Sequence, residues 1–141
     1  MILRTLEQIA GDEGKAPDRR ILDVGCGNGL FFEKLLRFGD VSGIEPDEQL
    51  VDPEGPHAGQ IQVGFFDSSC QAEKPLDWIL MLDVLEHMDQ PAEALRHARQ
   101  MLRPGGKLVV TVPAFMLLWT QHDVWNQHHT RYRRRPLVEL V

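Results

Sequence analysis

The amino-acid sequence predicts an α/β fold in which a parallel sheet lies between two layers of helices. Residues 21–24 form an apolar run that stops at three alternating glycines and leads into a segment of helical periodicity. Further short apolar runs recur along the chain, separated by helical or polar segments. Polar residues follow several of these runs, and a parallel sheet binds ligands at the carboxyl ends of its strands. The sequence therefore also predicts a ligand-binding site at the carboxyl ends of the strands.

Residues 1–39 predict a helix, a strand and a further helix. Residues 1–10 carry apolar residues at helical spacing, and residues 11–18 form a polar linker. The apolar run at 21–24 predicts a strand buried on both faces. After the glycines a helix with a broad buried face is expected, ended by Gly39 in a left-handed conformation. Its buried face is predicted to comprise Leu30, Phe31, Phe32, Leu35 and Leu36.

Four more strands complete the prediction, so that strands and helices alternate. Pro53 and Gly55 exclude a long helix before the third strand. Proline in the first turn favours a helix at residues 91–102, and a further helix is expected to begin at residue 136. The predicted strands are residues 41–44, 60–65, 76–82 and 107–112.

Length and composition favour one soluble domain. The chain has 141 residues, and its 26% of charged residues and 43% of hydrophobic residues are ordinary for a globular protein. No window approaches the roughly 20 apolar residues of a membrane span, so we expect a cytoplasmic protein without membrane contact. The net charge of −6 argues against nucleic acid as a partner. Cys26 and Cys70 lack metal spacing, and we expect two reduced thiols.

The glycine run is the strongest functional signal. Glycine has no Cβ and tolerates positive φ, so a strand that ends in Gly25, Gly27 and Gly29 lets the backbone approach a ligand closely. A dinucleotide fingerprint requires glycine where Leu30 stands, which disfavours an NAD-dependent oxidoreductase. The alternative without a ligand is a tight strand-to-helix turn.

Several motifs in order resemble class I S-adenosylmethionine-dependent methyltransferases. The run from Asp23 to Gly29 is similar to the first motif of that family, and Leu85-Glu86-His87 after the fourth strand resembles a small-molecule subgroup. The resemblance covers residues 20–135. It implies a three-layer αβα Rossmann-like sheet, and methyl transfer from S-adenosylmethionine to an oxygen, nitrogen or carbon atom of a small-molecule acceptor. S-adenosylhomocysteine would be the product.

The resemblance also implies a cofactor site at the ends of the first four strands. The glycine loop would wrap the methionine part, and an acid at the position of Asp67 would accept from the adenine amino group. Glu45 follows the second strand, where a carboxylate accepts hydrogen bonds from ribose hydroxyls, unless it is a solvated loop acid. Phe66 covers the adenine or is plain core. The implied residues are Asp23, Gly25, Cys26, Gly27, Gly29, Glu45, Pro46, Phe66, Asp67, Asp83 and Val84.

His87 is the predicted catalytic residue, because the resemblance places it near the transferred methyl group. An imidazole can deprotonate a hydroxyl acceptor at neutral pH, although His87 could instead fix its loop through a backbone hydrogen bond. Asp83, Glu86 and His87 also resemble a divalent-metal cluster of some methyltransferases. The expected pattern has glutamate where Asp83 stands, and we predict no metal site.

The aromatic and histidine-rich segment after the fifth strand stands where the family builds its acceptor site. It is predicted to bind the acceptor through His122, His129, Arg131 and Tyr132, the alternative being a packed aromatic loop. We expect one domain over residues 1–141, with the cofactor-binding core at 20–113 and the acceptor-side segment at 114–141. The last two strands of the family are missing, so a homo-oligomer could cover the open sheet edge. The alternative function is therefore a non-catalytic nucleoside-binding or dimerising module.

Overall fold

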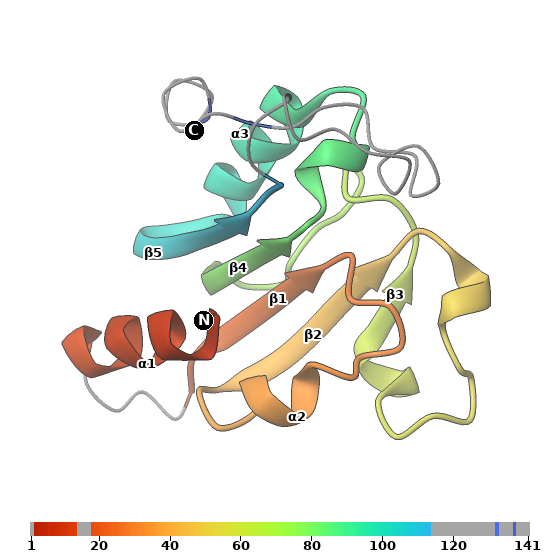
Figure 1. Ribbon diagram of the computed structural model, residues 1–141, viewed down its shortest axis with the longest axis horizontal. Helices are drawn as coiled ribbons and strands as arrows, with labels where there is room; N and C mark the ends of the chain where they lie inside the picture. Colours follow the sequence, from red (N-terminus) through yellow and green to blue (C-terminus); the bar gives the residue numbers. More distant parts are fainter. Residues whose placement is uncertain (1, 14–17, 114–131, 133–136, 138–141) are drawn as a thin grey trace.

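Five parallel strands form the middle layer of the molecule, in the order β3-β2-β1-β4-β5 (Figure 1). The structure, a computed structural model, describes residues 2–13, 18–113, 132 and 137. This confirms the predicted α/β fold with five parallel strands. The strands are β1 (Arg20–Val24), β2 (Asp40–Glu45), β3 (Ile61–Val63), β4 (Leu76–Leu82) and β5 (Leu102–Thr111).

The strand order creates a crevice at the carboxyl end of β1. This central strand pairs with β2 on one side and with β4 on the other, and its last residue, Val24, lies opposite Ile44 and Met81. The chain thus runs outward in both directions from β1. In such parallel sheets, ligands bind outside the carboxyl ends of the strands at the point where the order reverses.

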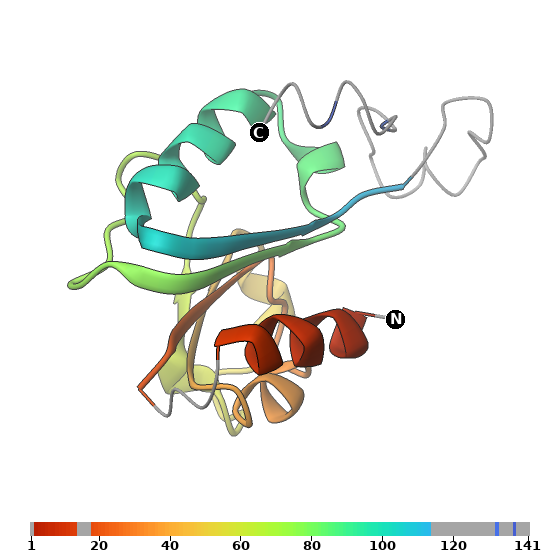
Figure 2. The same ribbon diagram turned by 90° about the vertical axis from the view of Figure 1, so that its left-hand side faces the viewer.

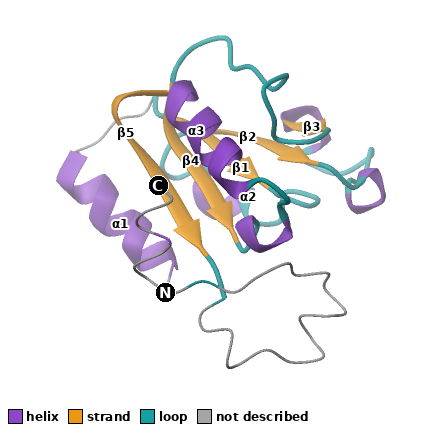
Figure 3. Ribbon diagram, turned by 90° about the horizontal axis from the view of Figure 1, so that it is seen from above, coloured by secondary structure: helices purple, strands orange, loops and turns teal. Residues whose placement is uncertain are grey.

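Helices cover both faces of the sheet, as the three-layer prediction requires. Figure 2 shows α1 (Ile2–Glu13) and α2 (Phe32–Leu35) on one face and α3 (Pro91–Met101) on the other. Seen from above, α3 lies over the sheet on the side of β4 and β5 (Figure 3). The sheet has a hydrophobic core on each face. Alternate residues of β4 pack into these two cores, because successive side chains of a strand point to opposite faces. Trp78 and Leu80 pack with α1 and α2, whereas Ile79 and Met81 pack with α3.

The helix after the glycine loop is shorter than predicted, and its predicted cap is wrong. Phe32 and Leu35 are fully buried, but Leu30 is 80% exposed and Leu36 is 43% exposed, so the apolar face is narrower than expected. Gly39 does not have a positive φ. A Cβ at this residue would lie 2.1 Å from the carbonyl oxygen of Arg19, so glycine is needed here for close backbone approach.

The expected alternation of strands and helices fails on both sides of β3. The β2–β3 connection contains only two short 3₁₀ helices, η1 (Glu48–Leu50) and η2 (Ala58–Gln60). Residues 64–75, between β3 and β4, contain no helix. Prolines and glycines interrupt the first connection, and serines and Pro75 occupy the second, so neither segment sustains a helical apolar repeat. Phe66 and Cys70 of the second connection are buried in the α3-side core.

β5 begins earlier than predicted and forms an edge of the described sheet. Leu76 pairs with Leu102 and Trp78 pairs with Lys107, so residues 103–106 form a bulge at the start of the strand. The helix predicted from residue 136 lies outside the described residues, apart from Leu137. Within the described part of the chain, no helix is both long and apolar enough to span a bilayer.

Candidate functional site

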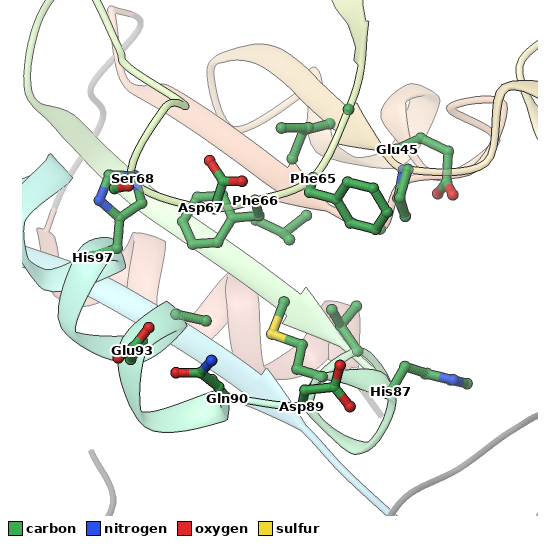
Figure 4. A pocket seen from close by; sticks show the side chains of 18 of the residues that line it. Glu45, Phe65, Phe66, Asp67, Ser68, His87, Asp89, Gln90, Glu93 and His97 are labelled. Atoms are coloured by element: carbon green, nitrogen blue, oxygen red, sulfur yellow. The ribbon is translucent and has the colours of Figure 1, made fainter.

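A pocket of about 1170 Å³ lies at the carboxyl end of the sheet. Its walls are the ends of β1 and β2, the segments that follow β3 and β4, and the pocket-facing side of α3. Figure 4 shows Glu45, Phe66 and Asp67 along one side of the pocket and His87, Asp89 and Glu93 along the other. The topology therefore brings residues distant in sequence together around one cavity.

The pocket wall is strongly acidic. It contains six carboxylates and a single guanidinium, that of Arg96. Such a wall favours a cationic or neutral ligand over an anionic one. The carboxylates belong to Glu45, Asp47, Asp67, Asp83, Asp89 and Glu93.

All three glycines of the predicted loop have positive φ, at 72°, 55° and 75° in chain order. Only Gly25 lines the pocket, and a Cβ there would lie 2.7 Å from Cγ2 of Val84. At Gly27 a Cβ would meet nothing within 4 Å. A Cβ at Gly29 would lie 3.1 Å from that of His57, in the packing beneath the loop. The motif thus marks both a tight turn and an approach to the pocket.

Asp23 and Cys26 are not among the residues that line the pocket. Asp23 is 4% exposed, and burial raises its pKa to about 7. Cys26 packs down onto β2, where a Cβ at Gly43 would lie 2.4 Å from its sulfur. Burial, with added repulsion from Asp23 and Glu45, raises the pKa of Cys26 to about 12. This thiol is therefore protonated and unreactive at physiological pH.

Glu45 is a buried acid at the pocket edge, not a solvated loop acid. Only 5% of the residue is exposed to solvent. The backbone N–H of Gly27 donates to its Oε2 at 2.8 Å, and that of Asp47 donates to its Oε1 at 3.0 Å. A carboxylate has about four acceptor positions, so Glu45 retains acceptor capacity for a ligand. Pro46 follows it in the pocket wall.

The segment after β3 supplies an aromatic and an acidic wall. Phe66 belongs to the core and also lines the pocket, with its ring centroid 5.2 Å from that of His97. Asp67 is exposed, and Ser69 donates to its Oδ1 from both the backbone N–H and the hydroxyl, at 2.8 and 2.6 Å. These hydrogen bonds lower the pKa of Asp67. The carboxylate is therefore charged at neutral pH and still presents Oδ2.

The segment after β4 carries Asp83, Val84 and His87 into the pocket wall. Val84 lies against Gly25, and residues 85–87 form the short 3₁₀ helix η3 (Leu85–His87). His87 is an exposed residue of the pocket wall. Glu86 is fully buried, whereas Asp83 is exposed. The described residues contain no group of three or more histidines, cysteines or acids arranged to hold a metal ion.

Comparison with known proteins identifies the family. Residues 2–141 match a family model described as a methyltransferase domain. The chain belongs to this family. A ubiquinone biosynthesis O-methyltransferase of Coxiella burnetii is 34% identical over 114 residues, which are 75% of this chain and 47% of that protein. One from Caulobacter sp. (strain K31) is 31% identical over 64% of this chain and 39% of its own length. The chain thus spans less than half the length of either relative.

Solved structures show the same fold. A SAM-dependent methyltransferase from Archaeoglobus fulgidus superposes with a TM-score of 0.71 at 16% identity, covering 99% of this chain and 65% of that one. The [4+2]-cyclase SpnF superposes with a TM-score of 0.68 at 23% identity, covering 98% of this chain and 55% of that one. These likenesses confirm the class I methyltransferase fold expected from the motifs.

Of the four residues predicted to bind the acceptor, the structure of this methyltransferase domain describes one, Tyr132. Tyr132 donates from its hydroxyl to the Leu85 carbonyl at 3.3 Å, and its backbone N–H donates to the Pro113 carbonyl at 3.0 Å. Burial, together with the charge of Glu86, raises the pKa of Tyr132. Tyr132 thus packs against η3 and is not part of the pocket wall. The predicted residues His122, His129 and Arg131 lie outside the described residues.

Sequence reasoning missed several wall residues of the methyltransferase domain. Phe65 is 73% exposed and Leu50 is 54% exposed, and both line the pocket as apolar surface. Phe65 ends the strand predicted at residues 60–65 and stands directly before the predicted Phe66-Asp67 pair, so its place at the carboxyl end of a strand was a usable signal. The wall residues on and before α3 have no such signal, because they depend on which side of the helix faces the pocket. They are Met88, Asp89, Gln90, Glu93, Ala94, Arg96, His97 and Gln100.

Proposed function

We propose that this methyltransferase domain binds S-adenosylmethionine in the pocket and transfers its methyl group to a hydroxyl of a small-molecule acceptor. The observation that carries the proposal is the hydrogen bond between Glu45 and Gly27, which joins a buried carboxylate to a glycine loop of positive φ. Membership of the methyltransferase family supports the same assignment.

The residues present fit this cofactor. Gly25 lines the pocket, and a Cβ there would clash with Val84, so the backbone can approach the pocket this closely only without a side chain at this residue. The acidic wall complements a sulfonium and an ammonium group. Glu45 suits ribose hydroxyls, Asp67 suits an adenine amino group, and Phe65 offers an apolar face to a base. The volume of about 1170 Å³ exceeds that of the largest typical small-molecule pockets, about 1,000 Å³.

When bound, S-adenosylmethionine supplies an electrophilic methyl group on a positively charged sulfur. The residues of the chain hold and orient the two reactants. Asp83 and Val84 line the side of the pocket nearest the glycine loop, and His87 accepts the proton of the acceptor hydroxyl on a ring nitrogen. A hydroxyl acceptor is proposed because the curated relatives are named O-methyltransferases.

Calorimetric titration with S-adenosylmethionine, S-adenosylhomocysteine and NADH tests the donor site. We expect micromolar binding of both adenosyl ligands and none of NADH, because Leu30 replaces the glycine of the dinucleotide fingerprint. A folded protein that binds neither adenosyl ligand would overturn the proposal.

Transfer of labelled methyl to a panel of phenols and catechols tests the acceptor side. We expect His87→Asn to lower kcat by about 100-fold or more while the affinity for S-adenosylhomocysteine stays unchanged. The same fold carries other reactions, as the cyclase SpnF illustrates. Donor binding without transfer to any acceptor would therefore favour the second candidate, a nucleoside-binding module.

A further inference from the structure

Asp83 has an unusual backbone conformation at the pocket wall. Its φ is 56°, and among the residues that the structure describes it is the one non-glycine residue with positive φ. This region is unfavourable for residues with a Cβ, although aspartate tolerates it better than most. Strained residues cluster at functional sites, where the surrounding structure holds them in place.

Thr111, the last residue of β5, holds Asp83 in place through hydrogen bonds. The backbone N–H of Asp83 donates to both the carbonyl oxygen and Oγ1 of Thr111, each at 3.0 Å. The Thr111 hydroxyl donates in return to Oδ1 of Asp83 at 3.2 Å. One hydroxyl thus accepts from the backbone and donates to the side chain of the same residue.

The conformation of Asp83 decides where the following residues lie. Val84 comes next and lies against Gly25, and η3 then carries His87 to the pocket. Thr111 lies opposite Leu82 in the sheet, so it acts at the point where the chain leaves β4. A rotation at this point would move every group that η3 brings to the pocket.

We propose that Thr111 is a positioning residue, whose hydroxyl holds Asp83 in the left-handed conformation and thereby fixes residues 83–87 against the glycine loop. The expected effect on affinity for the adenosyl ligand rests on the proposed function. The structural part of the inference does not depend on any ligand.

The test compares Thr111→Val, which keeps the shape and removes the hydroxyl, with Thr111→Ser, which keeps the hydroxyl. Amide hydrogen exchange of residues 83–88 is measured without ligand, and S-adenosylhomocysteine affinity is measured by calorimetry. For Thr111→Val we expect faster exchange and an affinity about tenfold lower, equal to about 1.4 kcal/mol. Thr111→Ser restores both, and Ser42→Ala, which removes a β2 hydroxyl bonded to the Ile21 carbonyl, changes neither.

Glycine at position 83 supplies an independent check. Glycine adopts positive φ without support, so Asp83→Gly combined with Thr111→Val is expected to regain slow exchange in the segment 83–88. Wild-type exchange and affinity in Thr111→Val, or failure of Thr111→Ser to restore them, would overturn the inference. If the wild-type protein binds no adenosyl ligand, the proposed function fails, while the exchange measurements still decide the role of Thr111.

Discussion

The carboxylate of Glu45 accepts a hydrogen bond from the backbone N–H of Gly27 at 2.8 Å, which ties the end of β2 to the middle of the glycine loop. Its other oxygen accepts from the backbone N–H of Asp47 at 3.0 Å. One buried side chain therefore fixes two backbone segments beside the pocket. The sequence predicted Glu45 as a ribose ligand, and the geometry adds a role in shaping the loop that the ligand would meet.

We predict that Glu45→Ala destabilises the protein by about 2 kcal/mol, because two backbone N–H groups lose their acceptor. The affinity for S-adenosylhomocysteine should fall more than about tenfold, since the loop and a ligand acceptor are lost together. Glu45→Gln retains one acceptor oxygen and should lose less. Urea unfolding and calorimetry measure the two effects. Glu48→Ala, an exposed change in η1, is the control, and equal stability of the two alanine variants would contradict the prediction.

The glycine loop gives a graded prediction. An alanine at Gly25 would be strained by a φ of 72° and would place its Cβ 2.7 Å from Val84. An alanine at Gly27 would be strained only by a φ of 55°. We expect Gly27→Ala to cost about 1–2 kcal/mol of unfolding free energy and Gly25→Ala to cost more. Gly11→Ala, in helix α1, should stabilise by up to about 1 kcal/mol. Urea unfolding ranks the three, and a loop variant as stable as Gly11→Ala would refute the assignment of strain.

The loop and the strands were predictable because their signals are local. Positive φ favours glycine at every second position of the loop. A strand buried on both faces is apolar along its length. The opposite wall of the pocket could not be predicted in this way. His97 lies there because α3 packs with one particular side toward the pocket, and Asp83 meets Thr111 across 28 positions of sequence. Such relationships are set by the tertiary packing.

Motif membership also proved a poor guide to which residues touch the pocket. Cys26 and Gly29 lie within the glycine motif, yet one packs on Gly43 and the other on His57. Their identities are explained by space behind the loop. Gly39 is a similar case in the fold. Its position after a helix predicted a left-handed cap, but glycine is needed there because the backbone of Arg19 lies too close for a Cβ.

The buried carboxyl of Asp23 predicts a pH dependence of stability. Burial raises its pKa from 3.8 to about 7 in the folded protein. Between these two values the folded state binds more protons than the unfolded state. The stabilising contribution is therefore fully present below about pH 3.8, declines as the pH rises, and is lost above about pH 7.

Asp23→Asn removes this titration while nearly preserving the side-chain shape. The unfolding free energy of the variant minus that of the wild type should rise between pH 4 and pH 7, by at most about 4 kcal/mol. Above about pH 7 the difference should level off. Urea unfolding at closely spaced pH values measures it, and Asp40→Asn, at an exposed β2 residue, is the control. A difference that does not change with pH would contradict burial as the cause.

His97 predicts a link between α3 and the segment 64–75. Its Nε2 lies 2.9 Å from the carbonyl oxygen of Cys70, so this nitrogen carries the proton and donates. The same ring lies against Phe66, with 5.2 Å between centroids. His97 therefore holds the segment that presents Phe66 and Asp67 to the pocket.

Replacing His97 with alanine should loosen this segment and weaken ligand binding. We expect faster amide exchange in residues 64–75 and an S-adenosylhomocysteine affinity about tenfold lower, because the hydrogen bond and the ring contact are lost together. Glutamine can place an amide N–H near the position of Nε2, so His97→Gln should recover the exchange protection more fully than the affinity. Arg99→Ala, at an exposed α3 residue outside the pocket wall, should alter neither. If His97→Ala exchanges as slowly as Arg99→Ala, other contacts hold the segment and His97 merely lines the cavity.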